Sequence, residues 1–200
     1  MDAALADPYA ADRALARRCV EGDRAAHREL FQSMSRRVHA TLYRLFGTNH
    51  QIDDLIQDAF LQVFRSLDRY RGEASLATWV DRCVVRVAYA EFRGRRRRAG
   101  FLEVVPELAS DEPSAEARLA ARDAVRRLYA ILDRLDADHR VAFVLHAIDG
   151  RPMDEVARLT EASLPATKSR VLRARREIEA RARRDRELLD FLPDDEGEAR

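Results

Sequence analysis

Arginine and aromatic side chains recur along one face of a helix that the sequence predicts at residues 75–98. At about 100° per residue, one narrow face of this helix carries Ser75, Thr78, Trp79, Arg82, Arg86, Tyr89 and Arg93. A further run follows at Arg95, Arg96, Arg97 and Arg98. Guanidinium groups neutralise phosphates and aromatic rings stack on unpaired bases, so this face is expected to bind nucleic acid, partly single-stranded. The alternative is a solvated charged face.

The opposite face of this helix is apolar and is expected to pack into a core. It carries Leu76, Val80, Cys83, Val84, Val87 and Ala88. Ser75 stands where an N-cap residue is needed. Cys19 and Cys83 lack the spacing of a metal or redox pair, and Cys83 on the apolar face is therefore expected to be a buried free thiol.

A second candidate surface lies on the helix predicted at residues 51–70, which Thr48 and Gln51 would start as a capping box. Its broad buried face carries Ile52, Leu55, Ile56, Ala59, Phe60, Val63 and Leu67. The other side carries Asp54, Gln57, Asp58, Leu61 and Phe64. Apolar residues within an acidic, polar face are typical of a protein-docking surface, although a neighbouring helix could cover them instead.

The C-terminal third has the pattern of a helix-turn-helix motif. A short helix is predicted at residues 153–159, and a longer basic helix follows Ser163, a good N-cap residue with Pro165 in the first turn. The N-terminal end of the longer helix would enter a major groove. The candidate contacts are Ser163, Ala166, Thr167, Lys168, Ser169 and Arg170, with Arg173, Arg175 and Arg176 toward the phosphates.

Composition and charge patterning favour an all-α chain. Apolar residues make up 46% of the sequence, glycine and proline are few, and no alternating strand-like segment stands out. The net charge of +1 conceals two basic patches. Residues 82–98 carry seven arginines and one acid, and residues 163–184 carry eight bases and two acids. Two separate patches indicate two contacts with a polyanion.

We expect two small helical domains joined by a linker. The predicted division is a flexible tail at residues 1–12, a first domain at 13–98, an acidic linker at 99–119, a second domain at 120–184 and an acidic tail at 185–200. Within the domains, the further predicted helices are a short and a long one over 13–46, broken at Gly22 and Asp23, then 118–135 and 138–148, the last followed by Gly150. No apolar run reaches the ~20 residues of a membrane span and no signal peptide is evident, so a cytoplasmic protein is expected.

Three of these stretches together resemble the sigma-70 family of RNA polymerase sigma factors, in particular its small extracytoplasmic-function group. The run DDLIQDAFLQVFRSLDRYRG is similar to the family's polymerase-binding helix, and ATWVDRCVVRVAYAEFRGRRRR is similar to its promoter-melting helix. Residues 132–178 resemble its C-terminal domain, in which KSR followed by RAR is the most recognisable part. The similarity covers about residues 13–98 and 120–182, in the order that the family has.

The resemblance implies partners for all three surfaces. Residues Asp54, Gln57, Asp58, Leu61 and Phe64 would dock on the clamp of bacterial core RNA polymerase. The loop at 68–74 and the melting helix, through Trp79, Arg82, Arg86, Tyr89, Arg93, Arg95 and Arg96, would capture the minus-ten promoter element as it opens. The helix-turn-helix would read the minus-thirty-five element as duplex. No enzymatic activity, cofactor, metal or membrane insertion is implied, and an anti-sigma factor is an expected partner.

The chain departs from the family pattern at several positions. Arg86 and Ala90 stand where the melting helix often has Asn and Asp. Glu161 replaces the glycine of the helix-turn-helix, and residues 165–167 read Pro-Ala-Thr in place of Gly-Thr-Val. These departures bear on base contacts rather than on the fold.

Three other functions fit parts of the sequence. A stand-alone helix-turn-helix regulator would account for residues 138–184, but not for Leu61 and Phe64 on an acidic face. A metal-dependent nuclease would be built on Asp53, Asp54 and Asp58, but no histidine or second acidic cluster completes such a site. A helical scaffold would use the basic faces only to bind acidic proteins.

Overall fold

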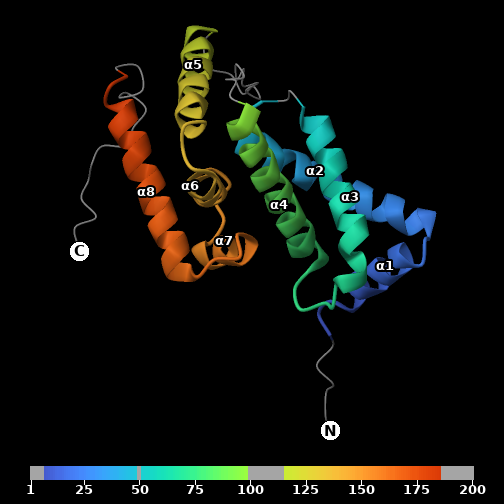
Figure 1. Ribbon diagram of the computed structural model, residues 1–200. Helices are drawn as coiled ribbons and strands as arrows, with labels where there is room; N and C mark the ends of the chain where they lie inside the picture. Colours follow the sequence, from blue (N-terminus) through green and yellow to red (C-terminus); the bar gives the residue numbers. More distant parts are fainter. Residues whose placement is uncertain (1–6, 49–50, 99–114, 186–200) are drawn as a thin grey trace.

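The segments with helical periodicity in the sequence form helices throughout the described part of the chain. The computed structural model describes residues 7–48, 51–98 and 115–185, with side chains over 7–48, 51–95 and 121–185. Every regular element within these ranges is helical, which confirms the all-α prediction. Two helical domains lie side by side (Figure 1). The predicted linker up to residue 114 and the tail from residue 186 lie outside the described residues, and so does the side chain of the predicted contact Arg96.

The first domain consists of α1 (Ala10–Val20), α2 (Arg24–Phe46), α3 (Ile52–Ser66), the 3₁₀ turn η1 (Leu67–Arg69) and α4 (Leu76–Arg98). The second consists of α5 (Ala115–Leu132), α6 (Ala137–Phe143), the π-helical turn η2 (Val144–Ile148), α7 (Met153–Leu159) and α8 (Leu164–Ala182). The single helix predicted at 138–148 is thus α-helical at its start and π-helical at its end. None of the helices in the described ranges is both long and apolar enough to cross a membrane.

Several helix ends follow the predicted local chemistry. Asp23 accepts a hydrogen bond from the Ala25 amide and caps α2, and Gly47 ends that helix at a φ of +70°. Ser163 accepts one from the Ala166 amide at 3.3 Å and caps α8. The predicted capping box before α3 is wrong, because Gln51 is itself the N-cap residue, at a φ of +64°, and its side chain makes no capping hydrogen bond.

The N-terminus of α4 is held by two residues, one of them in the predicted tail. The Ser75 hydroxyl accepts a hydrogen bond from the Thr78 amide at 3.2 Å, as predicted. The Asp12 carboxylate accepts one from the Leu76 amide at 2.7 Å. The prediction of a flexible tail is therefore wrong from Ala10 onward, because α1 begins there and its Asp12 closes the start of α4.

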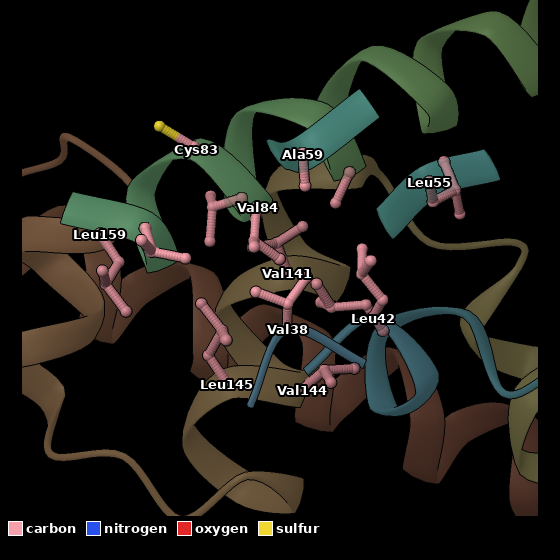
Figure 2. Close-up of a cluster of buried hydrophobic side chains, with 14 of the residues drawn as sticks. Val38, Leu42, Leu55, Ala59, Cys83, Val84, Val141, Val144, Leu145 and Leu159 are labelled. Carbon is pink, nitrogen blue, oxygen red and sulfur yellow. The ribbon is translucent and has the colours of Figure 1, made fainter. Parts of the chain in front are cut away.

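One continuous apolar core runs through both domains (Figure 2). From the first domain it takes Val38 and Leu42 of α2, Leu55 and Ala59 of α3, and Val84 of α4, and from the second Val141, Val144, Leu145 and Leu159. Cys83 is buried as predicted, and burial raises the pKa of its thiol. The two domains therefore bury apolar side chains against each other.

The Asp12 contact predicts a stability effect from outside α4. Asp12→Ala removes an acceptor from an amide at the helix N-terminus, and such losses cost about 1 kcal/mol. The free energy of unfolding, measured by urea denaturation, is expected to fall by about that amount. Asp68→Ala removes the same charge from an exposed position and serves as control. Equal values for the two variants would contradict the capping role.

Candidate nucleic-acid and protein interfaces

The arginine-aromatic face of α4 is only partly open to solvent. Trp79 and Arg82 at its start are half-buried, and Arg86 and Arg93 further along are exposed. Arg95 turns inward: its Nε donates to Glu91 Oε1 at 3.0 Å, and its guanidinium lies over the Phe46 ring at 4.8 Å. The predicted nucleic-acid contact by Arg95 stays a prediction, and in this structure its guanidinium pairs within its own domain.

An open pocket of about 200 Å³ lies where the loop before α4 meets the first turns of that helix. It is lined by Arg69, Tyr70, Arg71, Glu73, Ala74, Trp79 and Arg82. The Tyr70 ring meets Trp79 edge-on at 5.7 Å, and its hydroxyl donates to the Ala74 carbonyl at 2.7 Å. Burial raises the pKa of Tyr70 to about 12, which keeps this phenol neutral and able to donate.

Two polar atoms of the pocket residues have no hydrogen-bond partner within the described part of the chain: Trp79 Nε1 and Arg82 Nε. A buried donor without an acceptor is costly, so both N–H groups would gain from an acceptor atom that reached them. Gly72 of the adjoining loop has a φ of +77°, and a Cβ there would come within 2.7 Å of the Arg13 side chain. The pocket thus combines an aromatic wall with unused donors.

The acidic face of α3 lies in solvent, as predicted. Asp54, Gln57 and Asp58 are exposed, and Leu61 is 44% exposed. Phe64 is half-buried, because the His27 ring of α2 packs on it at 4.8 Å. Part of this face is therefore open, as a docking surface requires, and part is covered by the neighbouring helix α2.

Phe31 of α2 extends the same surface. Its spacing fits a buried position, yet it is 44% exposed, with its ring 4.6 Å from that of Phe60. We call Phe31, Leu61 and Phe64, with the acids Asp54 and Asp58, the α3 patch. Asp53 is exposed beside Asp54, and no group of metal-ligating side chains is found among the described residues.

The exposed face of α8 carries most of the predicted duplex contacts. Ser163, Lys168, Ser169, Arg173, Arg175 and Arg176 are exposed, and Ala166 is half-buried. The prediction for Thr167 is wrong, because its side chain is fully buried and its hydroxyl donates to the Ser163 carbonyl at 3.0 Å. Arg170 is half-buried, and its Nη2 donates to Asp138 Oδ2 at 3.1 Å.

Periodicity did not reveal the buried charges. Asp81 of α4 is fully buried, and Arg151, before α7, and Arg140 of α6 are nearly so. Arg151 Nη1 donates to Asp81 Oδ2 at 2.6 Å, so the two domains meet in a buried ion pair. The one hint in the sequence is an acid in a helix that is otherwise basic or apolar up to Glu91.

Comparison with known proteins gives the same two-part division. The sigma-70 region 2 family profile matches residues 30–98, and the sigma-70 region 4 profile matches residues 125–178. The RNA polymerase sigma factor NccH of Alcaligenes xylosoxydans xylosoxydans is 31% identical over 182 residues, which cover 88% of this chain and 96% of that protein. CnrH of Cupriavidus metallidurans is 31% identical over 183 residues, covering 87% of this chain and 95% of that one.

Solved structures agree in fold. The structure of CnrH in complex with the cytosolic domain of CnrY aligns with a TM-score of 0.59 at 26% identity, covering 88% of this chain and 99% of that one. The sigma factor RpoE from Bartonella quintana, in complex with the anti-sigma factor NepR, aligns with a TM-score of 0.58 at 21% identity, over 79% of this chain and 97% of that one. The chain belongs to the sigma-70 family, in its extracytoplasmic-function group, and is a sigma factor that directs promoter-specific transcription.

Proposed function

We propose that this sigma factor works through three separate surfaces: the α3 patch binds core RNA polymerase, the α4 pocket captures the opened minus-ten element, and α8 reads the minus-thirty-five element. The observation that supports it best is the pocket, where an aromatic wall and two unpartnered donors lie beside basic side chains. The first domain, residues 13–98, would carry the polymerase and minus-ten surfaces, and the second domain, residues 120–184, would carry the minus-thirty-five surface. The proposal includes no enzymatic step and places the chain in the cytoplasm.

The α3 patch suits a protein partner better than a nucleic acid. Leu61 and Phe31 offer exposed apolar surface, and the surrounding Asp54 and Asp58 would repel a phosphate backbone. Acidic side chains around an apolar centre complement a basic rim on a partner and favour fast association. Core RNA polymerase is the protein partner expected for a member of the sigma-70 family.

The α4 pocket suits one base released from the duplex. Flipping a base out costs a few kcal/mol, and stacking on an aromatic side chain returns about 1–3 kcal/mol per base. Trp79 and Tyr70 offer the rings, and Trp79 Nε1 and Arg82 Nε offer donors to base edges. Because capture offsets opening, no nucleotide hydrolysis is needed.

The α8 surface suits duplex DNA. Lys168 and Ser169 lie in the first two turns, where a recognition helix meets base edges. Arg173, Arg175 and Arg176 are free to neutralise phosphates, which set register rather than sequence. An anti-sigma factor belongs to the proposed partners, because the structural relative RpoE was solved in complex with the anti-sigma factor NepR.

Leu61→Asp tests the α3 patch. A charge at the centre of an apolar contact should lower the affinity for sigma-free bacterial core polymerase by about tenfold or more, since hot-spot losses reach ~2 kcal/mol. Val20→Asp, at a comparably exposed apolar position on α1, is the matched control. Binding is measured by fluorescence anisotropy of labelled protein. Equal affinities for wild type and Leu61→Asp would refute docking through this patch.

Trp79→Ala tests the α4 pocket. Loss of the stacking surface should reduce holoenzyme affinity for a forked minus-ten DNA by about 5- to 150-fold, the equivalent of 1–3 kcal/mol. Trp79→Phe keeps a ring but removes the unpartnered donor, so an intermediate loss is expected. Affinity for an upstream duplex should stay unchanged. A loss confined to the upstream duplex would reverse the assignment of the two domains.

A further inference from the structure

The loop at the rim of the α4 pocket is held by few hydrogen bonds of its own. Residues 70–75, which we call the pocket loop, join η1 to α4 without regular secondary structure. Within the described structure, the backbone amides of residues 71–75 donate to no backbone carbonyl. The Tyr70 hydroxyl closes the loop by donating to the Ala74 carbonyl at 2.7 Å. Because a segment with few backbone hydrogen bonds has low local stability, the position of this loop depends on the side chains packed on it.

Arg13 of α1 lies against the back of the pocket loop. A Cβ at Gly72 would come within 2.7 Å of Arg13 Cδ and 2.9 Å of Arg13 Cγ. Glycine at this position permits both the φ of +77° and the close approach of the arginine. Arg71 and Glu73, on either side of Gly72, line the pocket. The loop therefore has the pocket on one side and the methylene groups of Arg13 on the other.

The Arg13 side chain is itself held in place. Its guanidinium forms an ion pair with Asp7, in the segment that leads into α1. Asp7 Oδ1 also accepts a hydrogen bond from the Tyr9 amide at 3.0 Å, which orients the carboxylate. Both members of the pair are partly exposed, so the pair adds little to the free energy of unfolding. Its effect is to keep the arginine extended across Gly72.

Asp12, the residue before Arg13, contacts the far end of the same loop. Its carboxylate accepts from the Leu76 amide at 2.7 Å, where the pocket loop ends and α4 begins. Asp12 is also close to Tyr70: burial raises the pKa of Tyr70 to about 12, and the charge of Asp12 adds to this rise. Figure 1 shows the start of α1 beside the loop that leads into α4. Two consecutive residues of α1 thus contact the loop at its centre and at its end.

The position of the loop decides the shape of the pocket. Trp79 and Arg82 belong to α4, whereas Arg71, Glu73 and Ala74 belong to the loop. A binding site works when its groups are held within about 0.5 Å of the productive geometry. A shift of the loop would change the width of the pocket while the helical wall stayed in place.

We propose that Arg13 is a positioning residue for the minus-ten site. Its side chain, held by Asp7, supports the pocket loop at Gly72 and keeps the pocket at the width that one unpaired base needs. Arg13 acts through the loop and contacts no base. This inference rests on the proposed function, since it concerns the pocket assigned there to the minus-ten element.

Three variants of α1 isolate this support. Arg13→Ala removes the methylene groups behind Gly72 together with the ion pair to Asp7. Arg13→Lys is the conservative variant, because lysine retains Cγ, Cδ and a positive charge for Asp7. Arg17→Ala is the matched control, since Arg17 is an exposed arginine one turn further along the same helix.

The first measurement needs no DNA. Trp79 is the single tryptophan of the chain and forms a wall of the pocket, so its fluorescence reports on the pocket directly. Acrylamide quenching of the full-length chain should give a higher quenching constant in Arg13→Ala. Arg13→Lys and Arg17→Ala should match wild type. Circular dichroism, expected to be unchanged in all variants, separates a shifted loop from an unfolded chain.

The second measurement is the affinity of the holoenzyme for a forked minus-ten DNA. If the unsupported loop occupies the capture position about a tenth of the time, the affinity of Arg13→Ala falls by about tenfold. Arg13→Lys should restore it, and Arg17→Ala should leave it unchanged. Affinity for core polymerase and for an upstream duplex should be the same in all variants, because neither proposed surface includes the pocket loop.

Gly72→Ala tests the same contact from the side of the loop. It should lower the affinity for forked DNA and raise the quenching constant, because its Cβ meets Arg13 and its φ is strained. In the Arg13→Ala background the further loss should be smaller, since Cγ and Cδ are gone while the cost of the φ is the same. Losses that simply add would contradict a contact between the two residues.

Two further outcomes would overturn the proposal. One is a folded Arg13→Ala with wild-type quenching and wild-type affinity for forked DNA. The other is an equal loss in Arg17→Ala. If Arg13→Ala loses its helical signal, Gly72→Ala still decides, because unchanged quenching there would contradict the support.

Trp79→Ala separates this proposal from the proposed function. If Trp79→Ala lowers the affinity for forked DNA and Arg13→Ala does not, only the role of Arg13 fails. If Trp79→Ala binds forked DNA as wild type does, the proposed function of the pocket fails, and quenching in Arg13→Ala still shows whether Arg13 supports the loop.

Discussion

The buried carboxylate of Asp81 is the interaction on which the arrangement of this molecule depends. It lies on α4 with no exposed surface, and it accepts hydrogen bonds from Arg37 within the first domain and Arg151 from the second. An isolated carboxylate in such a site would be strongly disfavoured. Arg37 and Arg151 together compensate this charge, and Arg151 ties the position of the second domain to one acid on α4.

The buried ion pair between Asp81 and Arg151 fixes how the two domains meet. Its Coulomb energy largely offsets the cost of removing two charges from water, so it adds specificity of position more than net stability. The apolar core between the domains and the contacts from Arg140 and Tyr129 to the end of α2 supply the rest. The interface between the two domains is thus of mixed apolar and ionic character.

The fold was largely predictable, because local signals and packing agree. Apolar spacing predicted the helices, and Ser163 and Asp23 marked ends that the structure has. The exposed acids and Leu61 of α3 were also predicted from helical geometry alone. Contacts between distant segments were not: Asp12 at the start of α4, the burial of Thr167 and the pairing of Asp81 with Arg151 depend on which helices meet. Periodicity shows which side of a helix is apolar and which is polar. It does not show which other helix packs against each side.

The central claim, that this chain directs polymerase to promoters, is tested most directly by transcription with purified components. Sigma-free bacterial core polymerase is mixed with the chain and with fragmented genomic DNA, and the 5′ ends of the transcripts are sequenced. The account predicts discrete start sites that share two upstream sequence elements and that vanish when the chain is left out. Start sites scattered as with core polymerase alone, from a folded chain, would contradict it.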